Sequence, residues 1–405
     1  MDIRKGQNYV FVGLQAYDSP IGSNCINIAR EIAKHNRVLY VNYPLDQNAL
    51  IKQILKPEEN TAIRLEVLKG KKAELHKVTD NLYTLYQRSV INSINWLPDG
   101  RLYDWFNWRN NRRVAKKIMK YTRQLGFDKF FLFNDSDMFR SFYLKELLEP
   151  ELFIYYSRDN LISQAFFAKH GIRLEAKLIA KADLATANSL YLADYCKKFN
   201  ENSHYVGQGC ETDLFDPNAN YQRPQDLPEF DKPVIGYIGA LLKKRLDIDL
   251  LEYLAENNPQ WQFVYVGPED EHFRQSRLHQ QDNVLFTGSK KPTELPQYLN
   301  FFDVAMNPQE LNELTIGNYP RKIDEYLAMG KPTVATQTRA MEIFREHVYL
   351  GETREDYARL IERAISENSP EKESARIRFA KKHTWKASVD DIYQAMEQTL
   401  ATAKA

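Results

Sequence analysis

The sequence is poor in cysteine, in long apolar runs and in excess charge of either sign. Its three cysteines, Cys25, Cys196 and Cys210, are scattered and lack the spacing of metal ligands, so we expect neither a disulfide framework nor a cysteine metal site. The N-terminal apolar run Tyr9–Leu14 is too short for a signal peptide or a membrane span, and no other run approaches the ~18 apolar residues that a span requires. These absences predict a cytoplasmic protein and leave peripheral contact with the inner face of the cell membrane open.

Charge and glycine patterns argue against two further classes. Because 55 lysines and arginines balance 54 aspartates and glutamates, the net charge is +1, and we expect no nucleic-acid partner. The turn after the first strand, residues 15–23, lacks the G-x-G-x-x-G sequence that a dinucleotide-dependent dehydrogenase places there. At 405 residues, the chain is long enough for about two domains.

The order of apolar runs predicts an α/β protein. Residues 8–14 read as a buried strand, 24–35 as a helix and 38–41 as the next strand, which together make one right-handed βαβ unit. A second series of strands and helices begins with Val234–Ile238. We therefore expect two Rossmann-like halves.

A linker separates the two series. Residues 216–233 hold four prolines among polar residues, a composition typical of a spacer. The predicted domains are therefore 1–215 on the N-terminal side and 234–386 on the C-terminal side.

The most informative stretch runs from Val304 to Thr336. It begins with a short strand and continues through a polar, turn-rich loop. Pro320 then opens a helix, where its missing N–H costs nothing. Gly330-Lys331-Pro332 ends that helix before an extended run resumes.

The amino end of this helix is a candidate anion site. Its unpaired N–H groups carry about half a positive charge, which favours a phosphate, and Arg321 and Lys322 lie in the same first turn. Glu325 lies one turn further and can reach a polar group beside that anion. A phosphate followed by a hydroxyl-bearing ring such as ribose fits this order of groups. The alternative is an ordinary strand–loop–helix whose lysine and glutamate are solvated.

These residues carry a family resemblance. The stretch resembles the donor-nucleotide segment of group-1, family-four-like GT-B glycosyltransferases, through Pro320, Lys322, Glu325, Tyr326, Leu327, Ala328, Gly330, Lys331, Pro332 and Val334. The preceding Leu311–Thr315 is similar to the branch of teichuronic-acid and capsule synthesis. The resemblance implies a GT-B-like α/β fold, with two Rossmann-like domains facing across a cleft. It further implies a C-terminal helix, at about 387–405, that crosses back to complete the N-terminal domain.

The same resemblance implies a nucleotide-diphosphate sugar as the donor substrate, with no cofactor. Glu325 would bind the ribose. The family's second glutamate, usually eight positions earlier, is replaced by Gly317. We therefore place Glu313 from the preceding loop at the donor site, together with Gly317 and Asn318. Gly288 ends a later strand, where the family usually holds the nucleotide base.

A basic loop follows the first strand of the second domain. Gly239 comes first, then Ala240 where the family usually has an arginine, and Lys244 and Arg245 follow. With Lys322, these two cations would stabilise the charge that grows on the diphosphate as the glycosidic bond breaks. Such stabilisation needs no metal. Solubilising surface charge is the alternative for the basic pair.

The N-terminal domain is expected to hold the acceptor. Gly22 and Ser23 begin its first helix, and Asp159 follows a strand at the edge where open α/β sheets bind ligands. Asp159 resembles an aspartate of the family branch and would orient or deprotonate an acceptor hydroxyl. Pairing of Asp159 with the adjacent Arg158 is an equally open reading.

Two further motifs have competing interpretations. Asp135-Ser136-Asp137 resembles the metal-binding motif of the other main glycosyltransferase fold, but a cap for a helix over 138–148 is favoured. Residues 96–113 mix three tryptophans with four arginines. That composition suits a helix at a lipid headgroup layer, and also a helix that packs its aromatic rings inward, which we favour.

The sequence thus predicts a retaining, metal-independent glycosyltransferase of surface polysaccharide synthesis, acting on a glycan or lipid-linked acceptor. A nucleotide-sugar epimerase of the same fold is one alternative. A catalytically degenerate binding or scaffold subunit is the other, motivated by Gly317 and Ala240.

Overall fold

The computed structural model describes residues 2–19, 22–55, 62–210 and 212–402. The chain divides into two compact units. The N-terminal unit takes the chain up to Gly207 and again from Ser388 onward, and the C-terminal unit spans Gln208–Ala387.

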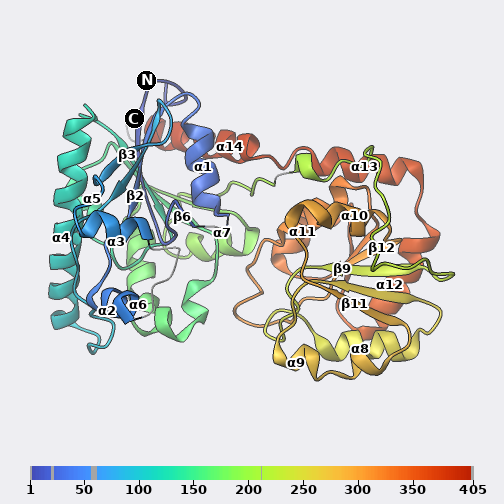
Figure 1. The fold of residues 1–405 in the computed structure, drawn as a ribbon. Helices are drawn as coiled ribbons and strands as arrows, with labels where there is room; N and C mark the ends of the chain where they lie inside the picture. Colours follow the sequence, from blue (N-terminus) through green and yellow to red (C-terminus); the bar gives the residue numbers. More distant parts are fainter. Residues whose placement is uncertain (1, 20–21, 56–61, 211, 403–405) are drawn as a thin grey trace. The chain divides into compact units, whose positions relative to one another are not determined.

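The N-terminal unit is built on a sheet of eight strands among the described residues, in the order β3-β4-β2-β1-β5-β6-β7-β8 (Figure 1). The strands are β1 (Asn8–Gly13), β2 (Arg37–Asn42), β3 (Leu75–Lys77), β4 (Leu82–Tyr86), β5 (Phe131–Asp135), β6 (Leu152–Ser157), β7 (Leu184–Ala187) and β8 (Ser203–Tyr205). All neighbours are parallel except β3 and β4. Residues 9–12 of β1 are fully buried, which explains why the strand reads as a continuous apolar run.

Helices pack on this sheet and share its core. They are α1 (Asn24–Ile32), α2 (Gln47–Leu55), α3 (Ala62–Leu68), α4 (Arg101–Gln124), α5 (Leu144–Leu148), α6 (Ala165–Lys181) and α7 (Leu190–Lys197). Val114 and Ile118 of α4 and Leu174 of α6 join Val10 of β1 in one apolar cluster. No helix in the described ranges is both long enough and apolar enough to cross a membrane.

The C-terminal unit contains a fully parallel sheet, which in the described residues has the order β11-β10-β9-β12-β13-β14 (Figure 1). Its strands are β9 (Val234–Ile238), β10 (Gln262–Val266), β11 (Val284–Gly288), β12 (Val304–Asn307), β13 (Thr333–Thr336) and β14 (Tyr349–Gly351). Its helices are α8 (Ile248–Asn257), α9 (Glu271–Arg274), α10 (Leu295–Asn300), α11 (Arg321–Ala328), α12 (Arg354–Ser366) and α13 (Pro370–Ala380). Because every strand runs the same way, all six carboxyl ends lie at one edge of the sheet.

The last helix, α14 (Trp385–Thr402), belongs to the N-terminal unit from Ser388 onward. Asn36 Nδ2 donates to the hydroxyl of Tyr393 on α14 at 2.9 Å. Arg4 pairs with Glu397 at 3.0 Å. These contacts hold α14 against the first unit, close to the start of β2 and to Arg4.

One local expectation is wrong. The helix expected over 138–148 is confined to α5.

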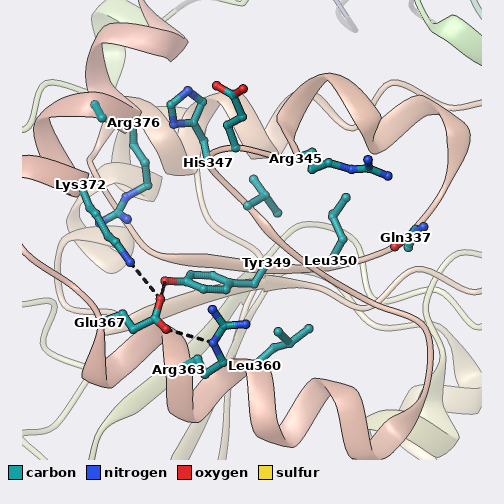
Figure 2. A pocket seen from close by; sticks show the side chains of 13 residues that line it. Gln337, Arg345, His347, Tyr349, Leu350, Leu360, Arg363, Glu367, Lys372 and Arg376 are labelled. Atoms are coloured by element: carbon teal, nitrogen blue, oxygen red, sulfur yellow. Dashed lines mark hydrogen bonds and ion pairs between the residues drawn. The ribbon is translucent and has the colours of Figure 1, made fainter.

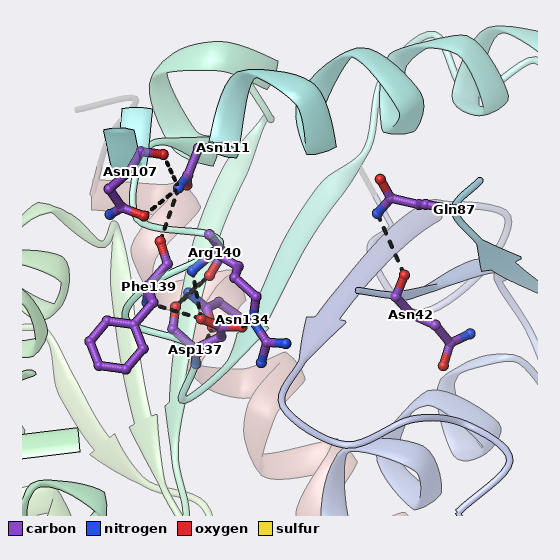
Figure 3. Close-up of polar contacts among 9 residues, drawn as sticks. Asn42, Gln87, Asn107, Asn111, Asn134, Asp137, Phe139 and Arg140 are labelled. Atoms are coloured by element: carbon purple, nitrogen blue, oxygen red, sulfur yellow. Dashed lines mark hydrogen bonds and ion pairs between the residues drawn. The ribbon is translucent and has the colours of Figure 1, made fainter. Parts of the chain in front are cut away.

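Asn111 of α4 explains the shortened helix at 138–148. Its Nδ2 donates to the carbonyl of Phe139 at 2.9 Å, and its Oδ1 accepts from the amide of Tyr143 at 3.0 Å (Figure 3). The side chain thus satisfies backbone groups that a helix would otherwise pair.

Candidate functional site

The predicted donor residues lie at the carboxyl edge of the C-terminal sheet. Gly239 directly follows β9, Gly288 is the last residue of β11, and the loop after β12 leads into α11. This edge is where parallel α/β sheets bind ligands. The structure therefore brings segments 239–247, 288 and 308–325 to one side of a single sheet.

Helix α11 is held rigidly beneath that edge. Pro320 is its N-cap residue rather than its first helical residue, and Gly330 follows the helix in a left-handed conformation (φ +69°). Ile323 and Leu327 are fully buried in the core. The Tyr326 hydroxyl accepts from the amide of Ile238 at 2.9 Å, which fixes the helix against the end of β9.

A buried polar pair braces the other face of α11. Asp324 is fully buried and accepts from the Tyr319 hydroxyl at 2.7 Å, and His383 Nδ1 lies 2.6 Å from its other oxygen. Burial raises the pKa of the Asp324 carboxyl, and the contact with His383 partly offsets that rise. Because this carboxylate lies in the first turn, it also complements the helix dipole that Arg321 and Lys322 oppose.

The amine of Lys322 is directed at the end of β9. It donates to the hydroxyl of Tyr237 and lies 4.0 Å from the centre of that ring. No carboxylate among the described residues lies within ion-pair distance of it. Lys322 is therefore a half-buried cation that makes no ion pair with a described residue, and its charge, with that of Arg321, partly offsets the rise in the pKa of Glu325.

The Lys322 amine packs closely against the backbone of Gly239. The φ of Gly239, +144°, is open to glycine, and a Cβ there would lie 2.8 Å from Lys322 Nζ and 2.9 Å from the Tyr237 hydroxyl. Gly267 after β10 makes a similar close approach, since a Cβ on it would overlap the carbonyl of Gly239. The two glycines let backbone and lysine share a narrow space at the strand ends.

Glu325 lies on the exposed side of α11, but its side chain is only 15% exposed. Burial raises the pKa of its carboxyl, and Arg321, whose Nε lies 3.3 Å away, partly offsets that rise. A desolvated carboxylate with one exposed arginine partner retains oxygen atoms that can accept from hydroxyl groups.

The loop after β12 is tied to the basic loop after β9. Asn312 Nδ2 donates to the carbonyl of Lys244 at 3.0 Å, and the amide of Glu310 donates to the carbonyl of Arg245 at 3.0 Å. The side chains of Lys244 and Arg245 are exposed and make no ion pair with any described carboxylate. The structure thus places these two cations, which lack an ion-pair partner among the described residues, on one loop. That loop is hydrogen-bonded to the loop that carries Glu313.

The remaining predicted donor residues differ in exposure. Glu313 is exposed, Gly317 is buried and Asn318 is half-buried. At Gly288, whose φ is +71°, a Cβ would meet nothing within 4 Å. Space is therefore open directly beyond the end of β11.

A cavity of about 630 Å³ lies elsewhere in the C-terminal unit, beside the edge strand β14 (Figure 2). None of the predicted donor residues lines it. At its floor Glu367 binds Lys372 at 2.9 Å, Arg363 at 3.0 Å and the Tyr349 hydroxyl at 3.1 Å. These contacts hold the pKa of Glu367 down at about 2. Since none of the residues predicted to bind the donor reaches this cavity, we keep the strand edge as the candidate donor site.

The N-terminal unit has its own candidate edge. Ser23 is the N-cap residue of α1, yet its side chain is buried and its Oγ has no hydrogen-bond partner among the described residues. Arg64 Nε, Gln87 Oε1 and Ser89 Oγ are also buried and unpartnered within the described chain. Gln87 and Ser89 follow β4, and Gly22, which is exposed, precedes Ser23. Unsatisfied buried polar atoms are costly, so each of these atoms is suited to a hydrogen bond with a hydroxyl-bearing ligand.

Asp159 is 45% exposed and pairs with Arg158 at 3.4 Å. Arg158 in turn lies 2.8 Å from the fully buried Asp135. Burial raises the pKa of Asp135 to about 6, with Arg158 opposing that rise. The sequence left pairing and acceptor contact open for Asp159, and the structure shows the pairing while leaving the carboxylate accessible.

The Asp135-Ser136-Asp137 segment satisfies backbone groups. Asp137 Oδ1 accepts from the amides of Phe139 and Arg140 at 2.9 and 2.8 Å, and Oδ2 accepts from Arg140 Nε at 2.9 Å (Figure 3). It therefore caps a turn, where a helix cap was expected. Within the described ranges, no group of three or more His, Cys, Asp or Glu residues is placed to hold a metal ion.

Sequence reasoning missed Tyr237, Tyr319, Asp324 and His383. Tyr237 stands two residues before Gly239, on the same face of β9, which is a weak signal. Asp324 and His383 lie 59 residues apart, and nothing in either local pattern indicates that they meet.

Comparison with known proteins finds similarity in the sequence of the C-terminal unit and in the fold. Residues 232–367 match the family model described as Glycosyl transferases group 1. A protein of Bacillus subtilis (strain 168), "Putative teichuronic acid biosynthesis glycosyltransferase TuaH", is 31% identical over 227 residues. That alignment covers 53% of this chain and 56% of the relative, so it spans little more than half of either protein.

Solved structures share the fold over nearly the whole chain. Sucrose-phosphate synthase from Thermosynechococcus elongatus superposes with a TM-score of 0.64 at 15% identity, covering 98% of this chain and 100% of its own. Anabaena HepE in complex with UDP and glucose superposes with a TM-score of 0.60 at 17% identity and the same coverage. At these identities the likeness establishes the fold, which is GT-B.

Proposed function

We propose that this chain is a glycosyltransferase. The premise is that residues 232–367 match the group 1 glycosyl transferase model and that the chain has a GT-B fold. The chain transfers a sugar from a nucleotide-diphosphate sugar to a glycan or lipid-linked acceptor in surface polysaccharide synthesis. The observation that carries the proposal is the Lys322 amine, which lies at Gly239 and makes no ion pair with a described carboxylate. A diphosphate would supply negative charge at this point.

Each donor contact follows from the chemistry of its residue. Lys322, Lys244 and Arg245 bind the diphosphate and stabilise the charge that develops on it as the glycosidic bond breaks. Glu325 accepts hydrogen bonds from the ribose hydroxyls. Glu313, Gly317 and Asn318 line the part of the site that faces the sugar. No metal is required, because these three cations stabilise the charge that develops on the diphosphate.

The acceptor binds the N-terminal unit. The unpartnered buried Ser23 hydroxyl supplies a hydrogen bond to its hydroxyl groups, and Asp159 orients the attacking hydroxyl. The anomeric configuration is retained, with the departing phosphate taking the proton of the acceptor. The enzyme acts in the cytoplasm.

Calorimetric titration with UDP, GDP, ADP and TDP tests the donor site. We expect one of them to bind, and Lys322→Met to weaken that binding roughly 10- to 100-fold, as expected for the loss of a charge-assisted hydrogen bond. Lys381→Met, which removes an exposed lysine after α13, is the matched control. Unchanged affinity in Lys322→Met and in Glu325→Ala would place the donor elsewhere.

The same titration separates the alternatives. Gly317 and Ala240 replace side chains that the resembled family uses, and binding of none of the four nucleotides would favour a scaffold subunit. If the donor is instead converted without any acceptor, the protein is an epimerase. Chelation with EDTA should leave transfer unchanged, and the coupling constant of the product's anomeric proton reports retention.

A further inference from the structure

One side of α4 forms an exposed surface of uniform charge. At 3.6 residues per turn, nine exposed residues fall within about 120° of the helix circumference. This α4 basic face consists of Arg101, Leu102, Trp105, Trp108, Arg109, Arg112, Lys116, Lys120 and Arg123, all of which are exposed. It runs for about 33 Å along one flank of the N-terminal unit (Figure 1).

The α4 basic face carries six cations and no carboxylate. None of the six makes an ion pair with a described residue. The helix has a single acidic residue, Asp104, which lies outside the face and pairs with Arg173 of α6. Because Arg109, Arg112, Lys116 and Lys120 follow one another at spacings of three and four, their like charges repel. An anionic surface would relieve a repulsion that nothing in the described protein relieves.

Large apolar side chains stand among these cations. Leu102, Trp105 and Trp108 are 55%, 51% and 38% exposed. The guanidinium groups of Arg109 and Arg112 lie over the rings of Trp105 and Trp108, at 5.6 and 5.2 Å. The opposite side of the helix is firmly held, since Val114 and Ile118 belong to the core. The expectation that the aromatic rings pack inward is therefore wrong for Trp105 and Trp108.

We infer that the α4 basic face docks the protein on a membrane surface rich in anionic lipid. Tryptophan prefers the headgroup layer, where its ring is buried and its N–H remains hydrated. Arginine and lysine on the same face attract anionic headgroups. A rigid helix with both kinds of side chain on one face suits a flat, negatively charged surface. The inference stands apart from the donor site and does not depend on it.

Sedimentation with vesicles tests the inference on the full-length chain. Vesicles of mixed phosphatidylglycerol and phosphatidylcholine should bind the protein, whereas pure phosphatidylcholine vesicles should not. Binding should weaken as salt rises. The triple variant Arg109→Gln, Arg112→Gln, Lys116→Gln should lower the partition coefficient at least about tenfold.

A matched variant controls for net charge. Lys177, Lys197 and Lys198 are exposed on α6 and at the end of α7 in the same unit. Replacing all three with glutamine removes the same charge and should leave binding within about twofold. Melting followed by circular dichroism shows whether each variant is folded.

A second pair of variants tests the aromatic part. Trp105→Ala with Trp108→Ala should also lose binding, whereas Phe199→Ala, which removes another exposed ring, should retain it. Tryptophan emission of the wild-type chain should shift to the blue on anionic vesicles. Equal loss in the α4 triple variant and its charge-matched control would overturn the inference. So would binding that ignores lipid charge, or an α4 face that binds RNA but not vesicles.

Discussion

Replacing Gly239 with alanine tests the geometry of the donor site most directly. The new methyl group would sit 2.8 Å from Lys322 Nζ and 2.9 Å from the Tyr237 hydroxyl, at a φ of +144° that L residues rarely adopt. Backbone strain costs about 1–2 kcal/mol. Displacing the lysine from the ring of Tyr237 costs a further ~0.5–2 kcal/mol.

The two costs together come to about 1.5–4 kcal/mol of unfolding free energy. The C-terminal unit spans Gln208–Ala387, and for a domain of that size about 1 kcal/mol shifts the midpoint by roughly 2–4 °C. Differential scanning calorimetry should therefore show a transition lowered by about 3–16 °C. Because Lys322 is displaced, nucleoside-diphosphate affinity should fall at least about tenfold.

Gly126→Ala is the control for strain alone. Gly126 has a φ of +66°, lies in the N-terminal unit, and a Cβ there would meet nothing within 4 Å. It should cost about 1 kcal/mol and leave nucleotide affinity unchanged. Equal stability loss in the two variants, with affinity retained in both, would refute the close packing of Gly239 on Lys322.

Two further predictions concern the cores of the two units. A Cβ on Gly236 of β9 would overlap the ring of Phe302. Urea unfolding should therefore show that Gly236→Ala destabilises the C-terminal unit by at least about 3 kcal/mol. The control is Gly22→Ala, where space is open, and its unfolding free energy should stay within about 0.5 kcal/mol of the wild type. Arg158→Met leaves the buried Asp135 carboxylate without its cation, so it should cost about 3–5 kcal/mol at about pH 8. That deficit should shrink near pH 5, because the pKa of Asp135 is already raised to about 6 and the neutral acid needs no partner; an equal deficit at both pH values would contradict this account.

The wild-type pH dependence has the same origin. An acid whose pKa is about 6 in the folded state and about 3.9 when unfolded keeps its proton longer when folded. Its contribution to stability is therefore complete below about pH 4 and is lost as the pH rises to about 6. Asp135→Asn should remove this slope from the unfolding free energy measured across that window.

The sequence was most informative where one physical rule acts alone. Continuous apolar runs such as residues 9–12 predicted the central strands, because a strand buried on both faces has no polar alternative. Proline and glycine at 320 and 330 marked the limits of α11, to within a residue at its start. The family resemblance placed Lys322 and Gly239 at the donor site without indicating that they touch, and the structure shows their close approach.

Contacts between distant residues could not be predicted in this way. The side chain of Asn111 replaces helical hydrogen bonds at Phe139 and Tyr143, so the local pattern there wrongly favoured a helix. The bracing of Asp324 by His383 depends on how α13 ends against α11. Such partnerships are decided by tertiary packing, which single-sequence periodicity does not contain.

The path of α14 has a consequence for how the polypeptide matures on the ribosome. Residues that complete the first unit, among them Tyr393 and Glu397, are synthesised only after the whole of the second unit. The second unit has all of its own residues by Ala387, so it can finish folding first. Until translation passes α14, the surface around Asn36 stays uncovered, and a ribosome stalled in that interval would expose an unfinished first unit to chaperones and proteases.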